Sequence, residues 1–354
     1  MPGGCDSVGG VPIRYPAPLR PGDRIGVTAP SSGVPTALLP RLEVCLEVLR
    51  QRGFEVVVGE CLSGDGVVSA PAQVRAEELM SMLLDPSVRA VVPPWGGELA
   101  VELLPHLDLD AVRQAEPTWV VGFSDLSTLL LPLTTLTATA TLHGQNLMDT
   151  AYRVPPPLLS WLDVVTRPPG ATLVQGPSER HRAHGQDAWE TDPSPTEFAV
   201  DTPGTWRLLD PGAGAVRARG RLVGGCIETV SVLAGTPYGD LPAFAAEHAP
   251  EGLLLYVEAS DDGALTIARD LWRMRLAGWF DHANAVLVGR TSAPAQEGFS
   301  QQDAVRSALA GLDVPVVLDV DCGHVAPHLS LVNGALTTVV VDGDEASLVQ
   351  ELVT

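Results

Sequence analysis

Three polar residues of the sequence carry the functional groups of a nucleophile, an acid and a base, and each follows an apolar segment. Ser124 lies between two apolar runs in "TWVVGFSDLSTLLL", Glu258 closes "GLLLYVE", and His324 follows "VPVVLDVDCG". A serine hydroxyl becomes an effective nucleophile when a neutral imidazole takes its proton and a carboxylate orients that imidazole. The residue types therefore point to acyl-transfer chemistry.

Each of these residues also has an ordinary structural interpretation. A Ser–Asp pair before an apolar run commonly caps a helix, a Glu at the end of a strand is often its first solvated residue, and "CGH" could form a plain turn. His143, which ends the apolar run of "TATATLHGQN", is a rival for the base. Spacing alone therefore leaves an α/β hydrolase of undecided type.

The turn around Ser124 also offers backbone donors. Its Gly-x-Ser-x pattern, with an apolar strand before and a helix after, resembles a nucleophile elbow. In such a turn the N–H of the next residue, Asp125, points at the developing oxyanion. A second donor is expected from Gly97 in "WGGELA", because a residue without a side chain permits close approach of the backbone.

The elements that would position these residues follow a repeating pattern. Short β-rich runs such as "DRIGVTAP", "FEVVVGE" and "TWVVGF" alternate with segments of helical spacing such as "TALLPRLEVCLEVLRQRG". This alternation predicts a parallel sheet with helices on both faces, a Rossmann- or flavodoxin-like α/β domain over residues 18–165. Ligands bind outside the carboxyl ends of the strands in such sheets, and Ser124 lies at one of these ends.

A second α/β domain is predicted over residues 219–354, where the alternation resumes and ends in an expected helix, "EASLVQELV". This domain carries Glu258 and His324. Residues 166–218 are rich in Pro, Gly, Asp, Ser and Arg, which predicts an irregular linker and substrate loop between the domains. Residues 1–17 are expected to form a flexible tail.

Composition limits the class of partner. The chain has 354 residues and a formal net charge of −21, and all 22 basic residues are Arg. An acidic surface without a basic run argues against nucleic acid and anionic membranes as partners. The absence of Lys excludes Schiff-base and Ser–Lys mechanisms. No HExxH motif and no His/Cys cluster with ligand spacing occur, so neither a metal nor an organic cofactor is expected.

The cysteines and the first residues bear on the cellular compartment. The count of five cysteines is odd, no CxxC pair occurs, and their neighbours are mostly apolar. This pattern predicts buried free thiols in a reducing compartment. The first residues lack the apolar core of a secretion signal, and no apolar run reaches ~18 residues. We therefore expect a cytoplasmic protein.

An ordered set of motifs extends from about residue 18 to about residue 345. It includes "LRPGDRIGVTAPSS", "GGELAVELLPHLD", "VVGFSDLSTLLL", "GRLVGGCIETVSVLAGTPYGD", "LLYVEAS" and "DVDCGHVAPHLSLVNGA". Together these motifs resemble the LD-carboxypeptidase family of serine peptidases. The resemblance implies an active site between two domains and a homodimer. It also implies a triad and two backbone oxyanion donors, namely Ser124, Glu258 and His324 with the amides of Gly97 and Asp125.

Within this family the chain is most similar to the microcin C self-immunity branch, whose members hydrolyse the bond between an acidic aminoacyl group and a linked adenosine. Three features favour this branch: "GGC" in place of Gly-Gly-Asn, the long segment between the domains, and the tryptophans of "DAWE" and "GTWRLL". The expected substrate contacts are Gly96, Trp189 and Glu228. Stacking of adenine on Trp189 would contribute roughly 1–3 kcal/mol. The alternatives are that Trp189 or Trp206 only holds the loop to the body and that Glu228 caps a helix.

These features predict a serine hydrolase that cleaves an amide or acyl-sulfamoyl bond in a small peptide or an aminoacyl nucleotide. Ser124 would attack, His324 would carry the proton, Glu258 would orient His324, and water would release the acyl-enzyme. Two alternatives stay open. One is a carboxypeptidase that removes the terminal D-amino acid from peptidoglycan tetrapeptide, and the other is a non-catalytic protein that binds an aminoacyl nucleotide.

Overall fold

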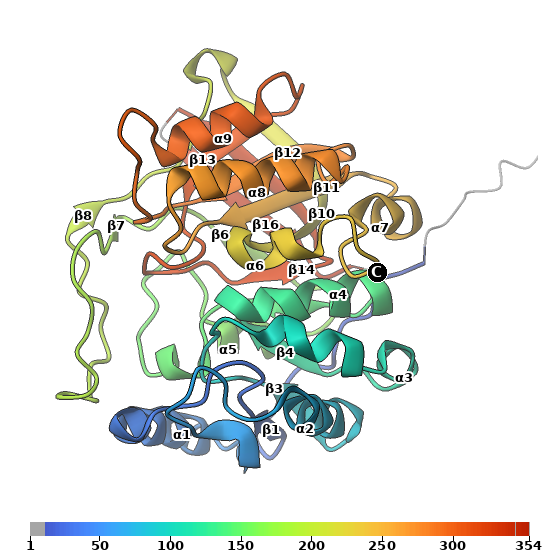
Figure 1. Ribbon diagram of the computed structural model, residues 1–354, viewed down its shortest axis with the longest axis vertical. Coiled ribbons are helices and arrows are strands. Elements are labelled where there is room, and N and C mark those ends of the chain that lie inside the picture. The colour runs from blue at the N-terminus through green and yellow to red at the C-terminus, as the bar shows by residue number, and fades with distance from the viewer. Residues whose placement is uncertain (1–10, 344, 354) are drawn as a thin grey trace, which may run out of the picture.

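Two β-sheets with flanking helices organise the residues that the computed structural model describes, 11–343 and 345–353 (Figure 1). The six strands of the first sheet lie in the order β14 (Leu331–Asn333), β5 (Thr141–His143), β4 (Trp119–Gly122), β3 (Val88–Val91), β1 (Arg24–Val27) and β2 (Glu55–Val58). The pairs from β5 to β2 are parallel, and β14 runs antiparallel to β5. The predicted parallel sheet is thus confirmed.

The second sheet is mixed. Its order is β6 (Thr172–Gln175), β16 (Glu345–Glu351), β15 (Leu336–Asp342), β10 (Val216–Cys226), β11 (Leu253–Glu258), β12 (Ala283–Gly289), β13 (Val316–Val320) and β9 (Arg207–Leu208). The strands from β10 to β13 are parallel, and antiparallel strands flank them on both sides. A small hairpin pairs β7 (Arg180–His181) with β8 (Thr202–Pro203). The parallel centre places the carboxyl ends of β11 and β13 at one edge.

The helices follow the spacing of apolar residues in the sequence. Those of the first half are α1 (Leu39–Gln51), α2 (Ala72–Leu84), α3 (Leu109–Gln114), α4 (Ser127–Thr137) and α5 (Trp161–Val165). Those of the second half are α6 (Ile227–Val230), α7 (Leu241–His248), α8 (Ala264–Leu276) and α9 (Gln301–Leu309). In α1, for example, Leu42, Leu46 and Leu49 share the buried face. Gly53, with a φ of 88°, follows its end, where a glycine readily adopts the left-handed conformation that terminates a helix.

Short 3-10 turns connect many of these elements. They are η1 (Thr36–Leu38), η2 (Glu60–Leu62), η3 (Ala100–His106), η4 (Ser124–Leu126), η5 (Leu147–Asp149), η6 (Pro211–Ala213) and η7 (Ser231–Leu233). Five of them, η1 to η5, follow the parallel strands β1 to β5 of the first sheet in turn, and so leave its carboxyl edge. They therefore lie where a parallel sheet binds its ligands.

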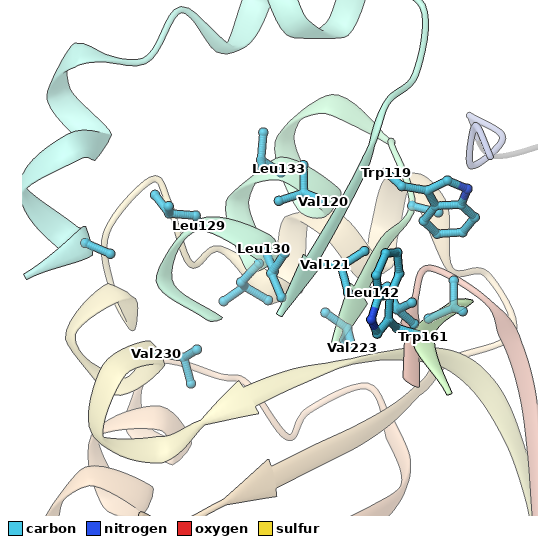
Figure 2. Close-up of a cluster of buried hydrophobic side chains, with 14 of the residues drawn as sticks. Trp119, Val120, Val121, Leu129, Leu130, Leu133, Leu142, Trp161, Val223 and Val230 are labelled. Carbon is cyan, nitrogen blue, oxygen red and sulfur yellow. The ribbon is translucent and has the colours of Figure 1, made fainter. Parts of the chain in front are cut away.

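The two halves share one hydrophobic core. Every residue of α4 except Leu136 is buried, and Figure 1 shows this helix between the first half, below, and the second half, above. A helix that is apolar all round must be covered on all sides. Figure 2 shows side chains of both halves in one cluster, among them Leu129, Leu130 and Leu133 of α4 with Val223 of β10 and Val230 of α6.

The pairing of strand β14 joins the two predicted domains. It belongs to the segment assigned to the second domain, yet it pairs with β5 of the first sheet, with Leu331 opposite His143. Its three residues are fully buried. The chain therefore returns to the first sheet after it has built the parallel centre of the second.

The prediction of a flexible tail is wrong for residues 11–17, and residues 1–10 lie outside the described residues. Ile13 is completely buried, and the hydroxyl of Tyr15 donates to the carbonyl oxygen of Gly334 at 3.1 Å. Arg14 forms a β-bridge with Thr139. The physical reason is the alternation of apolar Ile13 and Tyr15, since burial of a large apolar side chain contributes roughly 1.5–3 kcal/mol.

The prediction of a final helix is also wrong, because residues 345–351 form β16. This strand pairs with β15 on one side and β6 on the other. Leu348, Gln350 and Leu352 are buried, so burial alternates with the period of a strand rather than with that of a helix. Helix-forming residues such as Glu, Leu and Gln misled the prediction, and tertiary pairing overrides their preference.

The segment 166–218 is more regular than predicted. Its strand β6 extends one edge of the second sheet and its strand β9 extends the other. Trp206, next to β9, is only 2% exposed. The irregular part between them runs as a long arm that includes β7 and β8, at the left of Figure 1.

Two further expectations can be compared with the structure. Cys45, Cys61, Cys226 and Cys322 are buried free thiols, as predicted, and Cys5 lies outside the described residues. Among the residues that the structure describes, no helix has both the length and the apolar character needed to cross a membrane.

Candidate active site

Ser124 lies at a sharp turn between β4 and α4. The four residues of β4 are buried, and Ser124, which begins η4, has a φ of 66°. Residues other than glycine rarely adopt this left-handed region, and such strained positions cluster at functional sites. The strand, the strained turn and the following helix have the geometry of a nucleophile elbow.

The side chains of Glu258 and His324 reach this turn from the second sheet. Glu258 is the last residue of β11, and His324 lies in the loop after β13. Nε2 of His324 lies 2.9 Å from Oγ of Ser124, and Nδ1 lies 2.9 Å from Oε2 of Glu258. Glu258 is fully buried, whereas 23% of the His324 side chain is exposed. One imidazole thus contacts a hydroxyl and a carboxylate, an arrangement that can remove the hydroxyl proton.

The charges around this imidazole set its proton affinity. Burial by itself would lower the pKa of His324, but the charge of Glu258 and its hydrogen bond outweigh burial, so the pKa is raised. Burial would likewise raise the pKa of Glu258, but the charge and hydrogen bond of His324 lower it. The pair therefore favours imidazolium and carboxylate, the state formed when a histidine has taken the serine proton.

His143, the rival base, lies behind Glu258. Its side chain is 2% exposed, and burial lowers its pKa to about 4. Its Nε2 lies 4.0 Å from Oε1 of Glu258, and its ring packs edge-on against Tyr256. Because His324 is the histidine in hydrogen-bonding distance of Ser124, the geometry favours His324 as the base.

The glycines of "WGG" approach the nucleophile closely. A Cβ atom added to Gly96 would lie 2.7 Å from the amide nitrogen of Asp125 and 3.1 Å from Oγ of Ser124. Gly97 has a φ of 143°, and a Cβ atom there would lie 2.4 Å from Oγ of Ser31. Only a residue without a side chain fits at either position. The space beside the Ser124 hydroxyl is thereby left free for a substrate oxygen.

A pocket of about 620 Å³ opens beside His324. This volume is in the range of small-molecule sites. Its aromatic lining residues are Trp95, Phe123, Tyr152, Trp189 and Phe198. Its polar lining includes Arg182, Asp187 and Asp149, and burial raises the pKa of Asp149 to about 6.

Trp189 lines this pocket and is also held by the protein. Its Nε1 donates to the hydroxyl of Tyr152 at 2.8 Å. The fully buried guanidinium of Arg41 lies 4.9 Å from the centre of the Trp189 ring and 4.6 Å from that of Tyr152. Trp206, in contrast, is buried away from the pocket and donates to Asp321 at 2.8 Å. Trp206 therefore fits the alternative in which a tryptophan only anchors the loop to the body. Trp189 is anchored by hydrogen bonding and also forms part of the pocket wall.

Glu228 lies in the first turn of α6, and its oxygens bind the protein. Oε1 accepts from the backbone N–H of Ser260 at 2.7 Å, and Oε2 accepts from the thiol of Cys226 at 3.2 Å. Glu228 does not line the pocket beside His324. The structure thus places this carboxylate beneath the loop after β11.

One group of described residues could offer ligand atoms to a metal ion. It consists of Cys226, Glu258 and His324, whose ligand atoms lie within 4.8 Å of one another. Two of the three already share the hydrogen bond between Nδ1 of His324 and Oε2 of Glu258. Burial raises the pKa of the Cys226 thiol well above its usual range, which opposes the thiolate that metal binding requires.

Sequence reasoning missed several residues that line the pocket. Tyr152 and Phe198 stack with ring centroids 4.4 Å apart, and Asp149 lies in η5. None of these follows an apolar strand, which was the signal that identified Ser124 and Glu258. The remaining signal was an isolated aromatic residue in a segment rich in Pro and Asp, and it does not distinguish a pocket from a loop anchor.

Comparison with known protein families gives two matches. Residues 25–144 match the LD-carboxypeptidase N-terminal domain, and residues 219–339 match the LD-carboxypeptidase C-terminal domain. The first matched region contains β4 and the turn after it, and the second contains β11 and the loop after β13. The matched regions therefore include Ser124, Glu258 and His324.

Three relatives illustrate the range of similar proteins. A protein of Streptomyces coelicolor that is named as a carboxypeptidase is 31% identical over 314 residues, which cover 87% of each chain. The microcin C7 self-immunity protein MccF of Escherichia coli is 25% identical over 95% of each chain. The murein tetrapeptide carboxypeptidase of Pseudomonas aeruginosa is 24% identical over 91% of this chain and 94% of that protein.

Solved structures show the same fold. An MccF-like protein from Bacillus anthracis superposes with a TM-score of 0.78 at 22% identity, covering 96% of this chain and 99% of the other. MccF in complex with aspartyl sulfamoyl adenosine superposes with a TM-score of 0.77 at 23% identity, with the same coverage. At these identities the likeness establishes the two-domain architecture.

Proposed function

The chain belongs to the LD-carboxypeptidase family, and from this premise we propose that it is a serine hydrolase of aminoacyl nucleotides. Ser124 attacks the carbonyl carbon of an amide or acyl-sulfamoyl bond, His324 accepts the serine proton, and Glu258 orients the imidazole. The observation that carries the proposal is the pair of 2.9 Å contacts from one ring to Ser124 and to Glu258.

The reaction proceeds through an acyl-enzyme. Attack by Oγ of Ser124 forms a tetrahedral intermediate, whose oxyanion is stabilised by the backbone amides of Gly97 and Asp125. The imidazolium of His324 then donates its proton to the leaving nitrogen. A water molecule, activated by the same imidazole, hydrolyses the acyl-enzyme and restores the hydroxyl.

The pocket beside His324 supports a substrate with a nucleobase. Its aromatic walls offer faces on which a base can stack, a contact worth roughly 1–3 kcal/mol. Trp189 is the ring that we assign to this contact, because its hydrogen bond to Tyr152 and the Arg41 guanidinium fix its orientation. Structures of the relative MccF with aspartyl sulfamoyl adenosine and with glutamyl sulfamoyl guanosine agree with this substrate class.

The second candidate function is the removal of a terminal D-amino acid from peptidoglycan tetrapeptide. One relative is a murein tetrapeptide carboxypeptidase. Arg182 lines the pocket, is 14% exposed and binds Asp187. Its guanidinium could instead bind the carboxylate of a terminal amino acid, because planar guanidinium and carboxylate groups are complementary.

One mass-spectrometric assay distinguishes these functions. Purified protein is offered an aspartyl or glutamyl sulfamoyl adenosine and, separately, a muropeptide tetrapeptide. Ser124→Ala tests the nucleophile, and Ser81→Ala, on the exposed face of α2, is the matched control. Cleavage of the adenosine compound by the wild type and Ser81→Ala, but not by Ser124→Ala, is the expected result.

The other outcomes each have a definite meaning. Cleavage of the muropeptide alone moves the protein to the second candidate function. Cleavage that persists in Ser124→Ala rules out Ser124 as the nucleophile. Binding of the adenosine compound without cleavage of either substrate supports the third alternative, a non-catalytic binding protein.

A further inference from the structure

The carboxylate of Asp125, the residue after the nucleophile, joins separate segments of the chain. Asp125 is 1% exposed. Its Oδ2 accepts hydrogen bonds from the hydroxyl of Ser31 at 2.6 Å and from the backbone N–H of Ala100 at 2.7 Å. Its Oδ1 accepts from the hydroxyl of Thr128, in the first turn of α4, at 3.3 Å. The shorter bonds therefore go to residues far away in sequence.

The three joined segments leave three adjacent strands. Ser31 follows β1, Ala100 begins η3 after β3, and Asp125 follows β4. These strands lie side by side in the order β4, β3, β1, and their carboxyl ends meet at one edge of the sheet. Hydrogen bonds to a charged acceptor are shorter and stronger than those between neutral groups. One buried carboxylate can thus hold the three strand exits in a fixed relation.

The middle segment contains the two glycines beside the nucleophile. Gly96 lies against the amide of Asp125, since a Cβ atom there would be 2.7 Å from that nitrogen. Gly97 lies against the hydroxyl of Ser31, at 2.4 Å from such an atom, and this hydroxyl is the one that Asp125 binds. Loss of the carboxylate would remove its hydrogen bonds to Ser31 and Ala100. The segment with Gly96 and Gly97 would then be free to shift relative to Asp125.

We propose that the side chain of Asp125 is a positioning residue that sets the distance between the two oxyanion donors, its own amide and the amide of Gly97. The inference rests on the proposed function, because it concerns the same oxyanion. It assigns the side chain a role separate from that of the backbone amide. Displacement of a catalytic group by about 1 Å can cost roughly 100-fold in rate, so a change at this buried carboxylate can alter the rate through the two amides.

The test uses a fluorophosphonate, which needs no knowledge of the natural substrate. Oγ of an activated serine attacks phosphorus, fluoride leaves, and the serine proton passes to the histidine. The labelling rate is measured over a range of reagent concentrations, so that the maximal rate constant and the half-saturating concentration are separated. Mass spectrometry of a proteolytic digest verifies that the label is on Ser124.

The expected result is a loss in the maximal rate constant with an unchanged half-saturating concentration. For Asp125→Asn the loss is about 10- to 100-fold, and for Ser31→Ala roughly tenfold. Thr128→Val, which removes the donor nearby in sequence, in α4, gives a smaller loss than Ser31→Ala. Asp240→Asn, a change at the exposed cap of α7, leaves labelling at the wild-type rate.

Two results would count against different parts of the argument. Wild-type labelling rates in both folded Asp125→Asn and Ser31→Ala overturn the positioning role. A wild type that is not labelled at Ser124 counts against the proposed function instead. Circular dichroism and a melting curve establish folding, and Ser31→Ala decides alone if Asp125→Asn does not fold.

Discussion

The two halves of the molecule contribute to the candidate site in different ways. The first half contributes groups whose placement depends on the backbone, namely Ser124 at a φ of 66° and the amide of Asp125, which lies against Gly96. The second half contributes Glu258 and His324, whose function depends on protonation, and burial and mutual charge shift the pKa of each. Substitutions in the first half should therefore act through geometry, and those in the second half through the pH dependence of the reaction.

The largest effect is expected for Glu258→Gln in the second half. The amide cannot stabilise the imidazolium, so kcat should fall about 10³- to 10⁴-fold. The charge of Glu258 also raises the pKa of His324, and its loss should move the acid limb of the pH profile of kcat/KM to lower pH. Profiles of wild type, Glu258→Gln and the exposed control Glu77→Gln test both points.

The direction in which the wild-type kcat/KM changes with pH follows from the ion pair of His324 and Glu258. Activity requires neutral His324, and its pKa lies above the ordinary histidine value of 6.5. The acid limb of kcat/KM should therefore have its midpoint above pH 6.5, and activity should fall as the pH drops below that midpoint. A midpoint at or below 6.5 in the wild type, or one that Glu258→Gln leaves in place, would contradict the assignment.

The next effect is expected for Gly96→Ala in the first half. The added methyl group would lie 2.7 Å from the amide nitrogen of Asp125 and would occupy the space for the oxyanion. We expect kcat to fall about 10²- to 10³-fold, the loss typical of an oxyanion donor, with the pH profile unchanged. Gly64→Ala is the control, because the nearest atom lies 3.5 Å from its added Cβ.

A smaller effect is expected for Trp189→Leu. Loss of stacking should raise KM for an acyl sulfamoyl adenosine about 10- to 100-fold, with little change in kcat or in the pH profile. Trp272→Leu, on the 39% exposed tryptophan of α8, is the matched control. An unchanged KM for Trp189→Leu would leave this ring as a loop anchor and remove the main support for nucleobase binding.

The smallest effect concerns stability at low pH. Burial lowers the pKa of His143, in the first half, and of His328, in the second, to about 4. In the unfolded chain both take a proton near pH 6.5. Stability should therefore decrease as the pH falls from about 6.5 to about 4, because the unfolded state binds more protons. His324 has the opposite sign: its contribution is present below pH 6.5 and is lost as the pH rises through its raised pKa.

Melting curves between pH 7 and pH 4 test this behaviour. We expect His328→Asn to reduce the acid-induced decrease in Tm by roughly 5 °C, since the amide does not titrate. His282→Asn, a change in the turn before β12, should leave the pH dependence of Tm as in the wild type. An equal acid-induced decrease in wild type and His328→Asn would show that burial of His328 does not limit stability.

The sequence identifies Ser124, Glu258 and His324 because each lies at or just after the end of a continuous apolar strand. Ser124 and Glu258 directly end or follow buried strands, and the pattern of such strands can be read without a structure. The parallel sheet is confirmed for the same reason, while the family resemblance rests on the ordered motifs and is confirmed by the matches to both LD-carboxypeptidase domains. The oxyanion donors, the homodimer and the cytoplasmic location stay predictions.

The remaining features depend on contacts between distant segments. The edge strand β16 has a helix-forming composition, and its pairing with β6 and β15 makes it a strand. Glu228 stays a predicted substrate contact, and the structure adds hydrogen bonds from Ser260 and Cys226 to its oxygens. No local pattern reports either pairing, because a hydrogen bond across a loop leaves no period in the sequence.

The strand β14 has a consequence for how the protein can be made. It forms the outer edge of the first sheet next to β5, although the two strands are separated by most of the second half of the chain. During synthesis, β5 therefore has no outer partner until Leu331 leaves the ribosome. A fragment that ends before this residue would expose a strand edge open to aggregation, so we expect the nucleophile-bearing half to aggregate when it is produced alone.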